Sequence, residues 1–354
     1  MTELAAAARP VPSRAPGALL PAADPVVSLP IVTLLPFSRC NCRCAMCDIW
    51  KEKNGAALSV HDVERLLPGL ARLGTRRVVL SGGEPLMHPD LFGLVRPLRE
   101  AGLGLTLLSS GLLLERHAEA VAAAFDDVVV SLDGPASVHD AIRGVPGAFE
   151  RLRRGVAALR RHAPVPSLAG RCTVQRANSA HLCGTVAAAR EIGLDRVSFL
   201  AADTTSPAFG RASGWDEPAR ARVAPDGADL DRLEAEIARL EAGHGEDLAS
   251  GFVVESAAKL RSRLLDHFRA VAGGRTFPES SCNAPWVSAV VETDLSVRPC
   301  FFHPAYGRVG DEGLAAVVNG EAALRFRRGL DPATDPVCLR CPCRLNLRRG
   351  EEAP

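Results

Sequence analysis

The amino-acid sequence predicts an α/β protein whose parallel sheet forms an incomplete barrel, followed by a smaller C-terminal domain. Strand-like and helix-like segments alternate from Ile31 to about Leu200, and this alternation is typical of a parallel sheet covered by helices. It yields six repeats, whereas a closed barrel of this type has eight. Beyond Leu200 the alternation stops, and cysteines gather again near the C-terminus. We therefore expect an open barrel joined to a second, cysteine-bearing unit.

Each repeat is predicted from a short apolar run and a following amphipathic segment. The predicted strands span residues 31–35, 77–80, 103–108, 128–132, 168–174 and 196–200. The predicted helices span residues 58–73, 89–102, 115–125, 147–161 and 179–192, and Ser59 is a plausible N-cap of the first. Together these elements predict a partial (β/α)6 barrel of the TIM type, laterally open, with its chemistry at the C-terminal ends of the strands.

The chain divides into five predicted segments of different character. The first is rich in Ala and Pro, lacks a basic start, and is expected to be a disordered leader and not an export signal. The third combines an irregular stretch, 204–227, with helices at 230–240 and 256–271. The predicted segments are a leader at 1–30, the barrel at 31–203, a bridge at 204–278, an auxiliary domain at 279–345 and a tail at 346–354.

The bulk composition argues against several classes of function. The chain has 42 Lys and Arg against 41 Asp and Glu, a net charge of +1, so no basic excess indicates a nucleic-acid partner. No apolar run approaches the length of a membrane-spanning helix. Eleven cysteines in a long chain without a signal peptide indicate a reducing compartment and metal binding. We expect a cytoplasmic protein without nucleic-acid or membrane partners.

Four cysteines lie within eight residues, directly after the first predicted strand. Cys40, Cys44 and Cys47 make the spacing C-x3-C-x2-C. Three thiolates ligate three irons of a [4Fe–4S] cube and leave the fourth iron open to a substrate or cofactor. Cys42 would complete a zinc tetrathiolate, but zinc sites usually take their ligands as two separated pairs. The spacing favours iron–sulfur over zinc.

Small and polar residues follow three successive predicted strands. Gly82-Gly83-Glu84 follows the second strand, and Ser109 follows the third. Paired glycines let a backbone approach a ligand closely, and a carboxylate beside them can accept hydrogen bonds from an ammonium group. Ser131 and Asp133, after the fourth strand, share one face at period two. Each signal is weak alone, but all of them lie downstream of the cysteine loop at strand ends.

Taken together, these features resemble the radical S-adenosylmethionine (SAM) superfamily, in which the open iron holds the amino and carboxylate groups of SAM. Gly82-Gly83-Glu84-Pro85 matches the GGEP motif, which contacts the SAM amino group. Ser131-Leu132-Asp133-Gly134 and the stretch 139–144 match the ribose and carboxylate region of relatives with extra clusters. Met46 departs from the aromatic residue that often packs on adenine. The resemblance implies cofactor contacts at Gly82, Gly83, Glu84, Ser109, Ser131, Asp133 and Arg143.

A second group of cysteines lies near the C-terminus, around a predicted hairpin at 287–298 and a predicted helix at 314–329. Four thiolates with this spacing could bind zinc. In this context the segment resembles the twitch domain, the shortened form of the SPASM domain, which carries one auxiliary [4Fe–4S] cluster. Cys343 competes with Cys341 for the last position, and His303 is a less favoured ligand. The ligands that we assign are Cys282, Cys300, Cys338 and Cys341.

The resemblance implies a radical SAM oxidoreductase. The open cluster would cleave SAM reductively to a 5′-deoxyadenosyl radical, which abstracts a substrate hydrogen. The auxiliary cluster would accept a second electron and complete a two-electron oxidation. We expect a small-molecule substrate, a sugar or aminocyclitol-like intermediate, and a reductant of the flavodoxin or ferredoxin type.

Other outcomes stay open. A peptide-modifying maturase that forms thioether or carbon–carbon links ranks second, because no leader-binding module is visible. An epimerase would need a cysteine that returns hydrogen, and Cys172 on the fifth predicted strand is the candidate catalytic residue. Cys183 is unassigned. A non-catalytic zinc or iron–sulfur scaffold, or an electron carrier, would have no use for the GGEP stretch and Arg143.

Overall fold

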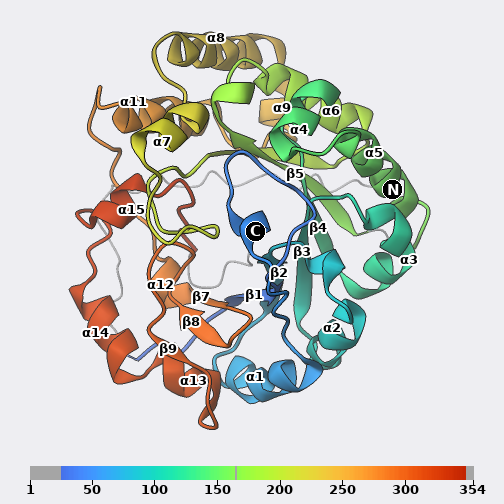
Figure 1. The fold of residues 1–354 in the computed structure, drawn as a ribbon, viewed down its shortest axis with the longest axis vertical. Coiled ribbons are helices and arrows are strands. Elements are labelled where there is room, and N and C mark those ends of the chain that lie inside the picture. Colours follow the sequence, from blue (N-terminus) through green and yellow to red (C-terminus); the bar gives the residue numbers. More distant parts are fainter. Residues whose placement is uncertain (1–24, 164–165, 348–354) are drawn as a thin grey trace, which may run out of the picture.

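The computed structural model describes residues 25–163 and 166–347 and contains one continuous sheet of nine strands (Figure 1). Its strand order is β6-β5-β4-β3-β2-β1-β7-β8-β9. Strands β1 to β6 pair in parallel with their sequence neighbours, and within the described residues β6 and β9 form free edges, so the barrel stays open. This confirms the predicted partial barrel. The strands are β1 (Ile31–Phe37), β2 (Arg77–Gly82), β3 (Gly104–Ser109), β4 (Asp127–Ser131), β5 (Ser167–Val174), β6 (Arg196–Ala201), β7 (Ser288–Val291), β8 (Ser296–Arg298) and β9 (Gly307–Arg308).

Helices surround the six parallel strands on their outer side (Figure 1). The first begins with a capping box: Asp62 N donates to Ser59 Oγ at 3.1 Å, and Ser59 N donates to Asp62 Oδ2 at 2.9 Å. Such a cap stabilises a helix by about 1 kcal/mol. The same helix buries Val63, Leu66 and Leu70 on the sheet. The covering helices are α1 (Val60–Arg72), α2 (Leu91–Glu100), α3 (Leu114–Ala124), α4 (Ala136–Arg143), α5 (Ala148–Leu159) and α6 (Leu182–Glu191).

Alternate residues of each strand face opposite sides of the sheet, and the two sides differ in chemistry. On β4, Val128 and Val130 are fully buried, whereas Asp127 and Ser131 are half-buried. Burying each valine side chain beneath the helices stabilises the fold by roughly 1.5–3 kcal/mol. The other face lines the barrel interior, where Asp127 pairs with Arg77 of β2. The interior of the barrel is therefore polar.

The C-terminal unit is built directly onto the barrel. Its first strand, β7, pairs in parallel with β1 in the register Ile31↔Ser288, and β8 and β9 continue the sheet antiparallel. Gly69 of α1 packs so closely on α13 (Gly313–Val318) that a Cβ there would lie 2.9 Å from Leu314 Cβ. The two units therefore share a sheet and a helix interface.

The predicted leader ends earlier than Pro30. Val26 N donates to Asn319 Oδ1 at 2.8 Å, and Asn319 Nδ2 donates to Val26 O at 2.9 Å. Leu29 is fully buried in the core. Residues 25–30 are therefore tied to the C-terminal unit, while residues 1–24 lie outside the described residues. At the other end, Leu347 N donates to Asn283 Oδ1 at 3.0 Å, so the first residues of the predicted tail are also anchored.

Three helix predictions need correction. The single helix expected at 314–329 is two helices, α13 and α14 (Glu321–Gly329), separated at Asn319, whose side chain is bonded to Val26. The stretch expected to be irregular contains α7 (Glu217–Val223), capped by Asp216. Helix α4 was not predicted. The remaining helices are α8 (Gly227–Gly243), α9 (Gly245–Ala249), α10 (Ala257–Leu260), α11 (His267–Val271), α12 (Ala284–Val287) and α15 (Pro336–Arg340). Short 3-10 helices are η1 (Ile49–Lys51), η2 (Pro85–Met87) and η3 (Arg176–Asn178), and η4 (Arg261–Asp266) is a π-helix.

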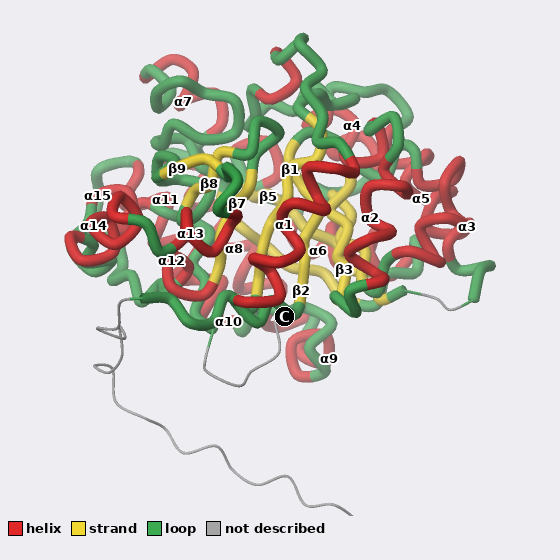
Figure 2. The backbone as a smooth tube through the Cα atoms, turned by 90° about the horizontal axis from the view of Figure 1, so that it is seen from below, coloured by secondary structure: helices red, strands yellow, loops and turns green. Residues whose placement is uncertain are grey.

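Figure 2 shows the strands enclosed by helices, with the C-terminal helices α14 and α15 gathered at one side of the sheet. Within the described part of the chain, every helix is too short or too polar to cross a bilayer.

Candidate cluster and cofactor sites

The first cysteine loop is held by the last turn of α4. Arg43 N donates to Arg143 O at 2.8 Å, and Ala45 N donates to Ile142 O at 3.1 Å. Carbonyls in the last turn of a helix have no partner within the helix, so the loop satisfies them. Gly144 ends the helix at φ 63°, and a Cβ there would lie 2.8 Å from Arg43 O. This contact therefore requires glycine.

The paired glycines after β2 bring a strand end against the same loop. A Cβ on Gly83 would lie 2.1 Å from Arg39 O, and Glu84 N donates to that oxygen at 2.8 Å. Gly82, at φ 104°, packs on Leu35. The two glycines thus allow the backbone after β2 to approach the cysteine loop closely. The sequence had led us to expect a close approach to a ligand.

The three predicted ligands of the first cluster lie together in a small apolar cluster. Cys40, Cys44 and Cys47 pack there with buried Cys42 and Met46. A hydrogen bond from Cys42 lowers the pKa of Cys40 and lowers that of Cys44 to about 6, whereas burial raises the pKa of Cys47 to about 12. Cys42 is thus a close neighbour of both the Cys40 and the Cys44 thiol.

The spacing of donor atoms distinguishes a cluster from a single ion. Among the described residues, only His303, Asp335 and Cys338 bring three such atoms within 4.8 Å of one another. The cysteines of the first loop are thus too far apart to surround one ion. Each thiolate of a cube binds a different iron, so its ligands lie further apart than those of one zinc. The loop fits a [4Fe–4S] cluster.

Asp133 and Arg143 form a buried ion pair below the loop. Arg143 Nη2 lies 2.6 Å from Asp133 Oδ2, and Nη1 donates to Cys44 Sγ at 3.5 Å. Thr173 N donates to Asp133 Oδ1 at 2.9 Å. Both terminal nitrogens of the guanidinium are therefore engaged, while the buried Nε has no hydrogen-bond partner among the described residues. The contact of Arg143 with the SAM carboxylate stays a prediction. The pair positions the loop.

Glu84 also positions the strands and does not face an open site. Ser109 Oγ and Leu86 N donate to its Oε1 at 2.9 and 3.1 Å, and Ser110 N donates to Oε2 at 2.7 Å. The residue is 1% exposed, and burial raises its pKa. Its carboxylate joins the ends of β2 and β3, and its contact with the SAM amino group stays a prediction. Ser109 is engaged in the same way, because its Oγ also accepts from Gly111 N.

Three of the predicted cofactor contacts keep accessible groups. Ser131 is half-buried on the inward face of β4, and Gly82 and Gly83 are half-buried at the end of β2. Their contacts with SAM stay predictions.

Cys172 does not face the barrel interior, so its prediction as a catalytic hydrogen donor is wrong. It is fully buried in the main core, its thiol lies by Thr185 of α6, and Asn178 Nδ2 donates to Sγ at 3.5 Å. Burial raises its pKa well above the ordinary value. The side chain belongs to the layer between sheet and helices.

Phe209 is a residue that the sequence did not indicate, and it connects the two cysteine sites. Its carbonyl accepts from Asp48 N at 2.9 Å and from Cys47 Sγ at 3.8 Å. Its ring lies 6.2 Å from that of Phe301 and 5.8 Å from that of Phe302, and these two phenylalanines directly follow Cys300 in the chain. Its φ of 55° is rare for a bulky residue, and such strain concentrates at functional sites. No sequence signal marks it apart from the neighbouring glycine.

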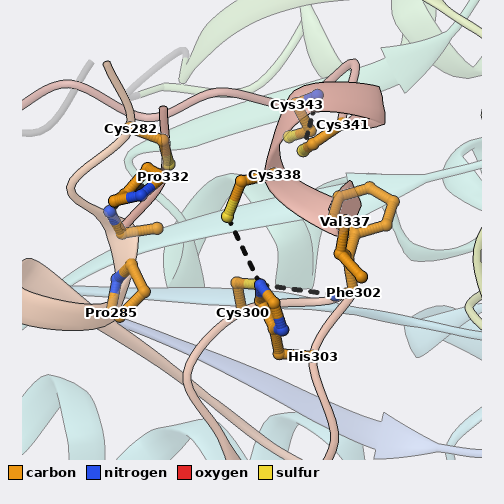
Figure 3. A pocket seen from close by; sticks show the side chains of 11 residues that line it. Cys282, Pro285, Cys300, Phe302, His303, Pro332, Val337, Cys338, Cys341 and Cys343 are labelled. Atoms are coloured by element: carbon orange, nitrogen blue, oxygen red, sulfur yellow. Dashed lines mark hydrogen bonds between the residues drawn. The ribbon is translucent and has the colours of Figure 1, made fainter. Parts of the chain in front are cut away.

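The five C-terminal cysteines line one pocket (Figure 3). Backbone amides donate to their sulfurs: Phe302 N to Cys300 at 3.5 Å, Ala284 N to Cys282 at 3.5 Å, and Cys343 N to Cys341 at 3.3 Å. Such bonds stabilise thiolates. Cys343 is the exposed member. The pocket fits a four-thiolate cluster, and the assignment of Cys282, Cys300, Cys338 and Cys341 stays a prediction.

His303 lies inside the same pocket and points at Cys338 (Figure 3). Its Nε2 is 3.4 Å from Cys338 Sγ and 3.7 Å from Asp335 Oδ1. Asp335 also caps α15 by accepting from Cys338 N at 2.8 Å. The histidine is thus placed to hydrogen-bond a cluster thiolate.

Comparisons with known proteins agree with this geometry. Residues 34–174 match the radical SAM superfamily, and residues 282–342 match the SPASM iron–sulfur cluster-binding domain. The chain is 29% identical to the PqqA peptide cyclase of Ruegeria pomeroyi over 93% of this chain and 84% of that protein. It is 35% identical to the AdoMet-dependent heme synthase of Methanosarcina barkeri over 44% of this chain, a match that spans less than half, 45%, of that relative.

Solved structures resemble the chain in fold. The structure of anSMEcpe with bound AdoMet superposes with a TM-score of 0.62 at 18% identity, over 86% of this chain and 84% of that one. Streptococcus suis SuiB bound to its precursor peptide SuiA gives a TM-score of 0.60 at 15% identity, over 89% and 71%. The two domain matches confirm the predicted cofactor classes, iron–sulfur clusters with SAM, and they favour an enzyme over a scaffold. The chain therefore contains a radical SAM domain at residues 34–174 and a SPASM iron–sulfur cluster-binding domain at residues 282–342.

Proposed function

We propose that this enzyme oxidises a side chain of a peptide substrate by two electrons. The observation that carries the proposal is that Phe209 contacts both cysteine sites. Its carbonyl accepts a hydrogen bond from the first cysteine loop, and its ring packs against the phenylalanines that follow Cys300. Two redox sites that contact one residue in this way would suit the removal of two electrons from one substrate.

Bound together, the first cluster and SAM supply a radical that removes one hydrogen atom from the substrate. The pocket lined by Cys282, Cys300 and Cys338 would hold a cluster able to accept one electron from the substrate, and solvent would take one proton, so the net change would be the loss of two hydrogens. The chain's own residues hold the parts in place: the Asp133–Arg143 pair and Glu84 fix the first loop, and the Phe302 and Ala284 amides stabilise the second thiolates.

A peptide substrate is favoured over the small molecule expected from the sequence. The relative named for a peptide, the PqqA peptide cyclase, aligns over most of both chains, and so includes the C-terminal domain. The match to the heme synthase covers less than half of either chain. SuiB, which shares the fold, was solved with a precursor peptide.

We propose a flavodoxin- or ferredoxin-type protein as the reductant.

The test begins with anaerobic reconstitution and counts of iron and sulfide. Two cubes contain about eight irons. SAM and a reductant are then added, and 5′-deoxyadenosine is measured by mass spectrometry. Cys44→Ser should abolish its formation, whereas Cys183→Ser, on the outer helix α6, should not.

The substrate is sought among peptides encoded beside the gene. A true substrate loses two hydrogens in mass, and deuterium placed at the reacting carbon appears in 5′-deoxyadenosine. Formation of 5′-deoxyadenosine without any two-hydrogen loss in peptides, together with such a loss in a small molecule, would reject the peptide proposal. Zinc in place of iron would reject the radical chemistry itself.

A further inference from the structure

We propose that Arg171, on the inward face of β5, binds a carboxylate of the substrate between the two cysteine sites. The inference rests on the proposed function and deepens it, because it names the chemical group that the enzyme recognises.

The direction of the Arg171 side chain follows from its neighbours along the strand. Cys172 is fully buried against the helices, and a Cβ on Gly170 would lie 2.9 Å from Leu194 and 3.4 Å from Val197. Both neighbours face the helix layer, so Arg171 points into the barrel. It is nonetheless exposed, although β4 and β6 flank its strand. The barrel interior is therefore open to solvent at this point.

Arg171 differs from Arg77 and Arg298, two other strand arginines, in having no acidic partner among the described residues. Its Nε donates to Ser198 Oγ at 2.5 Å, and within the described residues no carboxylate lies within 4.0 Å of the guanidinium. By contrast, Arg77 pairs with Asp127, and Arg298 pairs with Glu292 at 2.8 Å. Ser198 thus holds the Nε side of the Arg171 guanidinium, and the two terminal nitrogens stay available to a ligand.

One acid does act on Arg171 from beyond ion-pair distance. Glu255 interacts electrostatically with the guanidinium, but its Oε2 accepts from Phe199 N at 2.9 Å. Burial raises the pKa of Glu255, which weakens it as a counter-ion. The charge of Arg171 is therefore only partly balanced.

The position of Arg171 relates it to both proposed redox sites. In the sheet register it is the partner of Ser131, a predicted cofactor contact, on one side. On the other side its charge acts on Cys343, the exposed cysteine of the auxiliary pocket, as does the charge of Arg263 on η4. A group bound to Arg171 therefore lies between the cofactor side of the barrel and the auxiliary pocket.

A guanidinium with two free nitrogens in a fixed plane is suited to bidentate binding of a carboxylate. An acidic peptide side chain and a small dicarboxylate share this chemistry. Either would be held by Arg171 while the adjoining carbon faces Ser131. The carboxylate thus sets where along the interior the substrate lies.

The experiment uses the reconstituted holoenzyme with SAM and saturation-transfer NMR of three probes. The probes are N-acetyl-Ala-Glu-Ala-amide, its Gln counterpart, and glutarate. The Glu peptide should bind at least about tenfold more tightly than the Gln peptide, because charge-assisted hydrogen bonds contribute about 1.5–3 kcal/mol. Arg171→Gln should remove this preference, and Arg171→Lys should retain only part of it. Arg160→Gln, which removes an exposed arginine paired with Asp195, is the matched control and should keep the preference.

The inference would be overturned if the natural protein bound the Glu and Gln peptides equally and did not bind glutarate. It would also be overturned if Arg171→Gln kept the preference for the Glu peptide. Binding of glutarate alone supports the carboxylate site and assigns it to a small-molecule substrate. If Arg171→Gln does not fold by circular dichroism, Arg171→Lys and Ser198→Ala decide, since each should weaken the preference. Formation of 5′-deoxyadenosine by the natural protein without peptide is measured in parallel. Its failure rejects the proposed function, whatever the binding result.

Discussion

Asp133 Oδ2 and Arg143 Nη2 lie 2.6 Å apart, in a buried ion pair beneath the loop that carries the first three cysteines. The pair is joined to that loop twice, through Arg143 Nη1 to Cys44 Sγ and through Arg143 O to Arg43 N. Asp133 at the end of its strand and Arg143 at the end of its helix thus hold the cysteine loop in a fixed position on the sheet.

Asp133→Asn should destabilise the protein and impair loading of the first cluster. It leaves the buried Arg143 charge without a counter-ion, and breaking such a pair costs about 3–5 kcal/mol. Urea unfolding and iron per chain measure the two effects. Glu150→Gln removes the partner of Arg153 in an exposed pair and should leave both unchanged. A urea midpoint equal to that of the natural protein would contradict the role of Asp133.

Gly83→Ala should selectively disrupt the first site, because a Cβ would lie 2.1 Å from Arg39 O. The loop must move, while the C-terminal pocket is untouched. Iron should fall from about eight to about four per chain, and 5′-deoxyadenosine formation should stop. Gly243→Ala is the control, since nothing lies within 4 Å of a Cβ at that helix end. Full iron content in Gly83→Ala would refute this reading of the glycine pair.

Comparing Cys341→Ser with Cys343→Ser should show which of these two cysteines is a ligand of the auxiliary cluster. Cys341 is half-buried and accepts a hydrogen bond from Cys343 N, whereas Cys343 is exposed. We expect Cys341→Ser to lose about four irons and Cys343→Ser to keep about eight. Electron paramagnetic resonance of the reduced protein identifies which cluster is lost. The reverse pattern would make Cys343 the ligand.

His303→Ala should lower the midpoint potential of the auxiliary cluster. A hydrogen bond to a cluster sulfur favours the reduced state, and His303 Nε2 lies 3.4 Å from Cys338 Sγ. A redox titration followed by electron paramagnetic resonance measures the shift. His61→Ala, at an exposed site on α1, should leave the potential unchanged. Loss of the cluster in His303→Ala would indicate a ligand and not a hydrogen-bond donor.

His267 should make stability depend on pH in the acid range. Burial lowers its pKa from 6.5 to about 4, so between these values the unfolded chain binds the proton and the folded chain does not. The stabilisation is fully present above pH 6.5 and is lost as the pH falls towards 4. Urea unfolding from pH 4 to 7 should show this slope. His267→Phe, among Phe268 and Phe277, should flatten it, and an unchanged slope would assign the effect to other groups.

The sequence predicted the parts of the fold that depend on local pattern. The alternation of apolar runs predicted the six parallel strands, and the cysteine spacing predicted the first cluster site, whereas the second was predicted from the resemblance to the twitch domain. Ser59 as N-cap of the first helix was predicted from side-chain chemistry alone. Each of these signals lies within a few residues and is therefore readable along the chain.

The parts that could not be predicted depend on contacts between distant segments. The sequence does not reveal that Glu84 is satisfied by Ser109 and Ser110, or that Asn319 interrupts a helix to bind Val26. Cys172 shows the same limit, because a one-residue difference in strand phase decides whether a thiol faces the interior or the helices. Charged and polar groups close to a predicted ligand site can equally well be structural.

The pairing of β7 with β1 has a consequence for turnover. Because β7 and β1 are neighbouring strands of one sheet, backbone hydrogen bonds join the C-terminal unit to the barrel in addition to the covalent chain. We therefore expect the two units to keep their relative position during turnover, so that a substrate moves while the sheet stays fixed.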